Sequence, residues 1–445
     1  MRRFGSCWTG RNKVKNFSER QNIINDIEFR EEVGRMEHYI TEIAIKELRH
    51  LSNIVVSLNP EKRQHLIITG KNGSGKTSLL LALQKYLSAI NENMFRELVE
   101  QYIPSLSVME RQLNAAKTET EKQSVRERYK AVLNVTEQYT GGVRISFSEY
   151  KELDSLYRQG EFITAYYAAN RKTKIVRAKG AEDIKLALFY KVDSEPGELL
   201  HKYLVHLKTQ QAYARNEGDL VIVDRIQAWF DRFVDALRIL LDDDTVTLEY
   251  DYKEYDFKIH ESGRIPFGFD ELSDGYSSVI HIVSDLILRM DKNWLLRDTI
   301  SQYDIEGIVL IDEVETHLHI ELQKKIMPFL TRFFPRIQFI ITTHSPYILN
   351  SISNAKVYNL ERCIELEDLS VYSADGLAEG FFEADEYADE LKDKIDRYQE
   401  LKCKMDLTEE ERAERAKLRS ALKNIPQGLS REAADKFLAI EGKSL

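Results

Sequence analysis

Along most of the chain, short apolar runs alternate with longer stretches that space their apolar residues as a helix does. The runs at 65–70 (HLIITG), 307–312 (GIVLID) and 337–345 (IQFIITTHS) are rich in β-branched residues, which is typical of strands buried on both faces. Helical spacing follows at 79–90 and at 319–334. Strands that alternate with helices predict an α/β domain with a mostly parallel, covered core sheet.

A second pattern, the alternation of apolar and polar residues, predicts an antiparallel β part. It occurs at 39–48 (YITEIAIKEL), at 53–58 (NIVVSL) and again at 141–147 (GGVRISF). The longer alternation at 244–260 (DTVTLEYDYKEYDFKIH) predicts a hairpin, and 161–171 (EFITAYYAANR) begins as a further strand.

Two helical segments interrupt these strand patterns. Residues 92–137 are polar with apolar residues at helical spacing, and they predict a hairpin of two antiparallel helices, each ~20 residues and ~30 Å long. A solvated hairpin is favoured there over an arm that binds a partner. Residues 181–241 predict a helical lobe, whose Trp229, Phe230 and Phe233 are expected in its core rather than on a base-stacking surface.

These patterns divide the chain into three parts. An N-terminal extension at 1–35 precedes a main α/β domain at 36–360, and a charged helical region follows at 361–445. Within the charged helical region, the segment LTEEERAERAKL opens with a predicted capping box of Thr408 and Glu411.

The composition is that of a protein with a sizeable core and no membrane span. Of the 445 residues, 43% are hydrophobic and 31% charged, and no apolar run approaches the ~20 residues that a span requires. Cys7, Cys363 and Cys403 are too far apart for a disulfide framework or a zinc site, which favours a reducing cytoplasm. The basic N-terminus lacks the apolar core of a signal peptide, and Met36 is a candidate for an alternative start that the sequence alone does not decide. The net charge of -10 argues against a uniformly basic nucleic-acid binder.

The segment GKNGSGKT at 70–77 matches G-x-x-x-x-G-K-[ST] and lies between a predicted strand and a predicted helix. In that context it predicts a P-loop, because the glycines let successive backbone N–H groups turn inward around a phosphate at the helix N-terminus. Lys76 is expected to contact the β- and γ-phosphates of ATP, and Thr77 to bind Mg²⁺ through its hydroxyl. The expected nucleotide-binding residues are Gly70, Asn72, Gly73, Ser74, Gly75, Lys76, Thr77 and Ser78.

Polar residues also follow two later predicted strands. Asp312 and Glu313 end the run IVLIDE, at the strand end where α/β sheets place ligands. Downstream of a P-loop, this pair predicts that Asp312 holds Mg²⁺ and that Glu313 orients or deprotonates the attacking water. His344 ends the next buried strand about 30 residues later, a spacing that accommodates one helix and a return to a neighbouring strand. A neutral imidazole there is expected to contact the γ-phosphate or the water.

Between the P-loop and the acidic strand, the segment LSDGY opens a helix at which Ser273 and Gly275 expose backbone N–H groups. In this order, P-loop, Ser-x-Gly turn, Asp-Glu strand and His strand, the chain resembles the ABC-type ATPases, and most of all their SMC/RecF/OLD-like branch. LSDGY stands where that superfamily has an LSGGQ-like signature, with Asp274 replacing the first glycine and Tyr276 the glutamine. The resemblance spans roughly residues 39–360, and its four motifs in order are jointly specific.

The resemblance implies an ABC-type P-loop ATPase that works as a homodimer or a higher homo-oligomer. Ser273 and Gly275 would complete the ATP site of the partner subunit. The segment VETHLHIEL at 314–322 resembles the D-loop region of the OLD-like group. No convincing Q-loop glutamine is present, although Asn170 and Arg171 occupy a plausible place for it.

Three classes of function are compatible with this resemblance. The first is the ATPase subunit of a bacterial anti-phage defence system, similar to the Septu-type or PARIS-type ATPases, which responds to a phage-encoded trigger and controls a separate effector, expected to be a nuclease. The second is a RecF/SMC-like DNA-repair ATPase, although the insertion of 46 residues is too short for a long SMC coiled coil. The third is an OLD-type nuclease, whose Toprim domain would need ~100 residues. About 85 residues remain after His344 and the helix that follows it, and of these Glu441-Gly442 resembles only the opening of a Toprim domain.

Charge distribution bears on the choice between defence and DNA repair. The one dense basic cluster is predicted to be a solvated loop rather than a DNA contact. It consists of Arg171, Lys172, Lys174, Arg177 and Lys179. The charged helices at 376–438 offer a surface for another protein chain. The sequence therefore favours a defence ATPase that binds ATP and Mg²⁺, with DNA binding as the alternative.

Overall fold

The computed structural model describes residues 36–171, 175–291, 305–382, 389–404, 406–423 and 431–441. The expected extension at 1–35, with Cys7, lies outside the described residues, as do Lys172, Lys174 and Gly442. The chain forms two compact units. The first runs to His344 and includes Asn354–Glu367, and the second comprises Ser345–Ser353 and the chain from Asp368 onward.

A six-stranded sheet with the order β11-β10-β3-β9-β8-β5 forms the core of the first unit. Every neighbouring pair is parallel except β10 with β11, which confirms the predicted mostly parallel sheet. β3, β8 and β9 are buried along their whole length, as their continuous apolar sequences predict. The strands are β3 (His65–Thr69), β5 (Phe162–Tyr167), β8 (Glu306–Ile311), β9 (Ile337–Thr342), β10 (Ala355–Asn359) and β11 (Ile364–Glu367).

Three helices pack around this sheet or connect its strands. α2 (Lys76–Asn91) follows β3 and contacts β5 and β8, and α10 (Ile320–Phe333) connects β8 to β9. α9 (Asp274–Met290) contacts β5, and all of its residues from Ser278 onward are buried. A helix that is covered on every side in this way lies in the protein interior.

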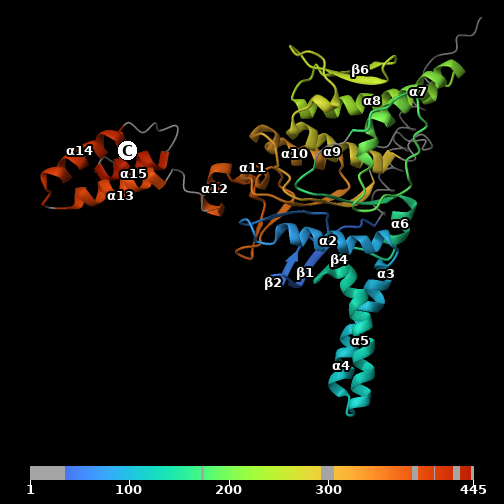
Figure 1. Cartoon of the computed structure of the whole chain (residues 1–445), viewed down its shortest axis with the longest axis horizontal. Coiled ribbons are helices and arrows are strands. Elements are labelled where there is room, and N and C mark those ends of the chain that lie inside the picture. Colours follow the sequence, from blue (N-terminus) through green and yellow to red (C-terminus); the bar gives the residue numbers. More distant parts are fainter. Residues whose placement is uncertain are drawn as a thin grey trace, which may run out of the picture. The chain divides into compact units, whose positions relative to one another are not determined.

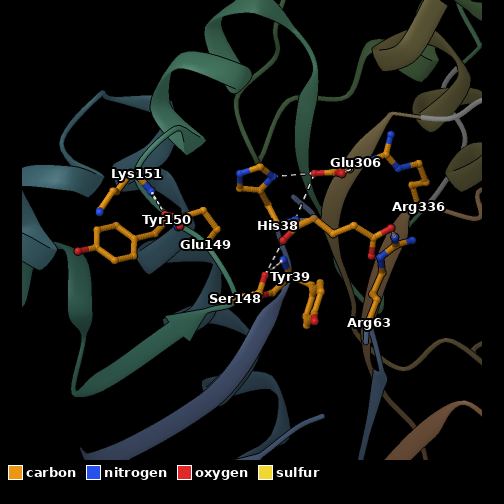
Figure 2. Close-up of polar contacts among 10 residues, drawn as sticks. His38, Tyr39, Arg63, Ser148, Glu149, Tyr150, Lys151, Glu306 and Arg336 are labelled. Carbon is orange, nitrogen blue, oxygen red and sulfur yellow. Dashed lines mark hydrogen bonds and ion pairs between the residues drawn. The ribbon is translucent and has the colours of Figure 1, made fainter. Parts of the chain in front are cut away.

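An antiparallel sheet of β1 (Ile40–Leu48), β2 (Leu51–Ser57) and β4 (Val143–Phe147) is joined to the core sheet by buried polar contacts. Glu306 is the first residue of β8. Its Oε2 lies 2.8 Å from His38 Nδ1, and its carboxylate also forms an ion pair with Arg336, as Figure 2 shows. Gln338 of β9 exchanges two hydrogen bonds with the backbone of Ile40, at 2.7 and 2.9 Å. These contacts fix Ile40, the first residue of β1, and the preceding His38 against the first residues of β8 and β9.

The predicted helical hairpin is present and extends away from both sheets (Figure 1). Its first arm is one helical run of α3 (Phe95–Glu97), a π-helical turn (Leu98–Tyr102) and α4 (Ile103–Ala115). Its second arm is α5 (Glu119–Thr140), which begins with a capping box formed by Thr118 and Glu121. The sequence pattern thus predicted two arms of nearly the observed lengths.

The helical lobe of the first unit contains α7 (Leu200–Glu217) and α8 (Leu220–Leu241), with the hairpin β6 (Thr247–Asp251) and β7 (Asp256–His260) beside them. α6 (Leu153–Gln159) precedes β5 and packs against β5 and α2. The three aromatic residues Trp229, Phe230 and Phe233 are buried, which confirms that they belong to a core. Trp229 stacks on Phe233 with ring centroids 5.4 Å apart, and its Nε1 donates to Asp291 at 2.5 Å.

The second unit is mainly helical. Its helices are α11 (Pro346–Leu349), α12 (Ala374–Phe382), α13 (Asp389–Cys403), α14 (Glu409–Lys423) and α15 (Arg431–Glu441). Ile395, Tyr398, Leu422 and Phe437 form its small apolar cluster. The predicted capping box is present, since Glu411 N–H donates to the Thr408 hydroxyl at 3.2 Å. In the part of the chain that the structure describes, no helix has the length and apolar character needed to cross a membrane.

Replacing Glu306 by alanine is expected to destabilise the first unit. The change removes a buried carboxylate from its ion pair with Arg336 and from His38, and the loss of one partner of a buried pair costs about 3–5 kcal/mol. The midpoint of thermal unfolding, followed by circular dichroism, should fall by roughly 5–15 °C.

Glu37→Ala provides the matched control for that measurement. Glu37 also pairs with an arginine, Arg63 at 2.7 Å, but its side chain is 40% exposed. Exposed ion pairs contribute only about 0–1 kcal/mol, so the midpoint should move by less than about 3 °C. Equal midpoints for the two variants would contradict the importance of the buried junction.

Candidate ATP-binding site

The P-loop connects β3 to α2, and its backbone turns back on itself. Ser74 N–H donates to the Lys71 carbonyl at 3.1 Å. Gly75 precedes α2 with φ of 97°, a left-handed conformation that favours glycine, and a Cβ there would lie 2.9 Å from Leu51 Cδ1. Within this described stretch, α2 has neither a capping side chain nor an acidic residue in its first turn. The partial positive charge of its N-terminus is therefore available to an anion.

Lys76, the first residue of α2, extends its side chain back across the loop. Its Nζ is buried and donates to the Gly70 carbonyl at 2.8 Å. Burial lowers the pKa of this amine, and three carboxylates close enough to matter act in the opposite direction. They belong to Glu313, Asp312 and Glu315. The carboxylates of the acidic turn after β8 therefore lie close enough to the P-loop lysine to stabilise its positive charge.

The acidic pair directly follows β8, and one threonine of β9 holds both residues. Asp312 is buried, and its Oδ1 accepts a hydrogen bond from the Thr342 hydroxyl at 2.6 Å. The same hydroxyl accepts from Glu313 N–H at 2.7 Å. Glu313 has φ of 43°, which is uncommon for a residue with a side chain and marks a sharp turn. The Asp312 carboxylate and the backbone of Glu313 are thus both held by the neighbouring strand.

His344 follows β9, the strand that lies between β3 and β8. Its backbone N–H donates to Glu315 Oε1 at 2.5 Å. Burial, and then Lys76, lower the pKa of the imidazole against the opposite influence of the carboxylates, so the ring is neutral near pH 7. Among the described residues, the buried atoms His344 Nε2 and Glu315 Oε2 have no hydrogen-bond partner. Both atoms can therefore bond to a ligand or to water.

The Ser-x-Gly turn lies at the start of α9. Ser273 is exposed and is the N-cap residue of α9, but its hydroxyl caps no backbone N–H, and Asp274 occupies the first turn. Gly275 is buried, and a Cβ there would lie 2.6 Å from the His317 carbonyl oxygen. The start of α9 therefore packs on the segment that follows Glu313. No hydrogen bond among the described residues joins Ser273 to the P-loop.

The prediction of a solvated basic cluster is wrong for Arg171. This residue is 7% exposed, and its guanidinium donates to protein atoms that include the carbonyl of Asp312. Arg177 pairs with Asp270 at 2.7 Å. A run of cations suggests solvent because burying a charge is costly, but a guanidinium with enough acceptors can be buried. Asn170, the other residue placed at the Q-loop position, is exposed.

Three residues near the acidic turn were not identified from the sequence as parts of the site. Thr342 looked like an ordinary strand residue, Glu315 was only part of a D-loop-like segment, and Arg171 was assigned to a solvated cluster or to the Q-loop position. The one available signal for Glu315 was a third carboxylate two residues after the Asp-Glu pair. The roles of the residues that the motifs single out remain predictions.

ATP and Mg²⁺ fit the groups that this site presents. The Ser74 hydroxyl is buried without a hydrogen-bond partner among the described residues, beside a loop whose N–H groups surround a phosphate in other P-loops. Thr77 is exposed, and its hydroxyl together with Asp312 matches the ligands of Mg²⁺. In the described residues no group of three or more His, Cys, Asp or Glu could hold a metal. Mg²⁺ on a nucleotide needs none, since phosphates and waters supply most of its ligands.

The comparison with protein families agrees with this chemistry. A family model described as "AAA domain, putative AbiEii toxin, Type IV TA system" matches residues 66–350, more than half of the chain, from β3 to the segment after His344. The chain belongs to this family. Membership in the AAA-domain family agrees with the predicted P-loop ATPase, and the mostly parallel sheet confirms the predicted α/β fold class.

Several curated proteins resemble parts of this AAA-domain chain. Septu protein PtuA of Bacillus mycoides (strain KBAB4) is 36% identical over 116 residues, which are 24% of this chain and 15% of that protein. The Retron Ec83 probable ATPase of Escherichia coli is 36% identical over 103 residues, 23% of this chain and 19% of that protein. The Retron Vc95 probable ATPase of Vibrio cholerae serotype O1 biovar El Tor is 40% identical over 87 residues, 19% and 16% of the two chains. Each match spans less than a fifth of the relative's length.

Among solved structures, the SMC head bound to the C-winged helix domain of ScpA covers 72% of this chain and 94% of its own, at 12% identity and a TM-score of 0.35. The SMC head domain from Thermotoga maritima gives a TM-score of 0.33 at 11% identity, covering 73% of this chain and 94% of its own. The family match and the curated relatives' names indicate an ATPase domain.

Replacing Lys76 by alanine is expected to weaken ATP binding strongly and leave the fold intact. The change removes a charge-assisted contact to phosphate that contributes about 2–4 kcal/mol, which corresponds to roughly 30- to 1000-fold in Kd. Titration of the purified protein with a fluorescent ATP analogue in the presence of Mg²⁺ measures the change.

Lys71→Ala is the matched control, because Lys71 lies in the same loop but is exposed and pairs with Glu361 at 3.0 Å. Its Kd should stay within about threefold of the parent protein, as is usual for an exposed ion pair. An unchanged Kd in Lys76→Ala would refute the P-loop assignment.

Proposed function

We propose that this protein binds ATP with Mg²⁺ and hydrolyses it at the carboxyl ends of β3, β9 and β8. The observation that carries the proposal is that the P-loop with Lys76, the turn with Glu313, and His344 follow three neighbouring parallel strands, β3, β8 and β9. Lys76 and Glu313 both influence the pKa of His344. A buried lysine, a turn of carboxylates and a neutral histidine at one sheet edge are the groups that phosphoryl transfer to water requires.

Each residue has a distinct proposed role. Thr77 and Asp312 would hold Mg²⁺, which supplies positive charge to the phosphate oxygens when it is bound. Lys76 moves from the Gly70 carbonyl to the β- and γ-phosphates. Glu313 orients or deprotonates the attacking water. His344 hydrogen-bonds the γ-phosphate or that water through Nε2, the buried atom for which the described residues offer no partner.

The proposed working form is a homodimer or a higher homo-oligomer. Ser273 is exposed at the start of α9, where backbone N–H groups favour an anion, and it makes no hydrogen bond to its own P-loop among the described residues. These N–H groups would bind the γ-phosphate held by a second copy of the chain. A two-fold arrangement then contains two equivalent composite sites.

In the cell, we propose an ATPase subunit of an anti-phage defence complex that controls a separate effector, a nuclease, after a phage-encoded trigger. The names of the similar proteins support this proposal, since they are a Septu protein and two retron ATPases. The buried Arg171 and the paired Arg177 leave less of the basic cluster available to DNA, which disfavours the DNA-repair alternative.

Replacing Glu313 by glutamine is expected to slow ATP hydrolysis by about 10²–10⁴-fold, because a positioned base contributes that much. ATP should still bind, since the P-loop is unchanged. Phosphate release and the Kd of an ATP analogue are measured side by side. Glu321→Gln is the control, because this glutamate is an exposed residue of α10 that pairs with Lys324.

A parent-like rate in Glu313→Gln would show that another group activates the water. The defence proposal is tested with the same variants in the native locus. Glu313→Gln and Lys76→Ala should abolish protection in a phage plating assay, whereas Glu321→Gln should retain it. Full protection by Lys76→Ala would refute a nucleotide-controlled defence function.

Mixing two inactive variants is expected to restore ATP hydrolysis if the sites are composite. Ser273→Arg places a bulky cation where the γ-phosphate would dock, and Lys76→Ala disables the P-loop. A mixed dimer joins the intact P-loop of one copy to the intact turn of the other, so one of its two sites is complete and the other carries both changes. Phosphate release is measured after mixing, with differently tagged copies to show that mixed dimers form. If such dimers form and stay inactive, the turn serves only its own helix.

A further inference from the structure

Arg171 uses its whole guanidinium to join three segments of the first unit. It lies just after β5, is 7% exposed, and donates through Nη1 to the carbonyl oxygens of Ala168 at 3.1 Å and Asp312 at 2.9 Å. Its Nη2 donates to the carbonyls of Glu313 at 3.3 Å and Val314 at 3.0 Å. Three of these four acceptors are consecutive residues of the acidic turn.

The fifth N–H group of Arg171 reaches the helix that carries the Ser-x-Gly turn. Nε donates to the Ser278 hydroxyl at 2.7 Å, and Ser278 is 2% exposed. A guanidinium has five N–H donors in a fixed planar arrangement, so every donor of Arg171 has a protein acceptor. Ser278 lies one helical turn beyond Gly275.

The same two segments meet at a second point. Gly275 approaches the His317 carbonyl so closely that an added Cβ would lie 2.6 Å from it. The start of α9 is thus packed against one end of the acidic segment, while Ser278 is bonded through Arg171 to the other end. A displacement of the start of α9 must therefore move this segment or break one of the two contacts.

The segment that Arg171 holds has a conformation that its own residues disfavour. Glu313 has φ of 43°, and a residue with a side chain in such a region costs of order 1–3 kcal/mol, which surrounding contacts must offset. Arg171 binds the carbonyl on each side of this residue and its own carbonyl. Burial lowers the pKa of Arg171 to about 10, against the opposing influence of carboxylates led by Glu315, so the guanidinium is still charged at pH 7.

We propose that Arg171 is a positioning residue that couples the start of α9 to the acidic turn, so that an anion docked at Ser273 changes the aim of Glu313 in the same chain. The docked group is the γ-phosphate of a nucleotide bound by a second copy. This inference rests on the proposed function, and it adds that the two composite sites of a dimer are coupled through each subunit. Binding at one site then raises the reactivity of the other, so the one complete site of a Ser273→Arg/Lys76→Ala mixed dimer should hydrolyse ATP, but more slowly than a site of the parent dimer.

Ser278→Ala tests the coupling, because it removes only the bond between Arg171 and α9. Ser284→Ala is the matched control, since Ser284 is a buried serine of the same helix whose hydroxyl has no partner among the described residues. Ser278→Thr keeps the hydroxyl and should restore parent behaviour. All three variants should bind a single ATP analogue with a Kd within about twofold of the parent, because the P-loop is unchanged.

Two measurements compare these variants. In steady-state hydrolysis, Ser278→Ala should lower kcat by about 10- to 100-fold with little change in KM, the effect of a misplaced catalytic group. In hydrogen exchange without nucleotide, peptides covering residues 312–318 should exchange faster in Ser278→Ala than in Ser284→Ala.

The exchange measurement separates this inference from the proposed function. If the parent protein hydrolyses no ATP, the proposed function fails, and exchange at 312–318 still decides whether α9 and the acidic turn are coupled. If Ser278→Ala matches Ser284→Ala in exchange, or if Ser278→Thr fails to restore the parent rate, Arg171 is a brace of the fold and the coupling is refuted.

Discussion

The parallel pairing of β9 between β3 and β8 is the constraint on which the candidate site depends. Ile68 pairs with Thr342 across one boundary, and Ile311 pairs with Ile341 across the other. The pairing continues past the strand end, since Thr343 N–H donates to the Ile68 carbonyl at 3.0 Å. Because side chains alternate between faces, a slip of one residue would turn the threonine away from the carboxylate that it holds. The register of β9 against β8 therefore determines whether Thr342 can hold Asp312 in place.

Charge is the second constraint that this edge of the sheet must meet. Asp312, Glu313 and Glu315 place three carboxylates within four residues, and such a group repels itself unless cations lie nearby. Arg171 is buried and donates to main-chain carbonyls of the acidic turn, so its positive charge has a fixed position, while the Gly70 carbonyl holds the buried Lys76 beside the P-loop. A fixed charge needs little reorganisation when a reaction redistributes electrons near it, which is the basis of electrostatic preorganisation in enzymes.

The features that were predictable from the sequence depend on short-range order. The P-loop binds through consecutive backbone groups, and Asp312 and His344 directly follow apolar runs, so local spacing reveals them. Arg171 differs, because its partners lie between 107 and 143 residues away, apart from Ala168. A run of cations in a chain predicts solvent exposure, and only the folded structure shows that buried carbonyl oxygens surround one of them. The role of Thr342 could not be predicted for the same reason. The sequence of an apolar strand does not show which residue of a neighbouring strand its last side chain contacts.

The close approach of Gly275 to the His317 carbonyl limits how this protein can change over evolutionary time. Most tight contacts between side chains can be relieved by a compensating substitution, because the neighbour can become smaller. Here the neighbour is a main-chain oxygen, which every amino acid carries, so no second mutation at that position creates room. A side chain at position 275 therefore cannot be accommodated by making residue 317 smaller. Asp274 and Tyr276, the two departures within LSDGY, are not subject to this restriction.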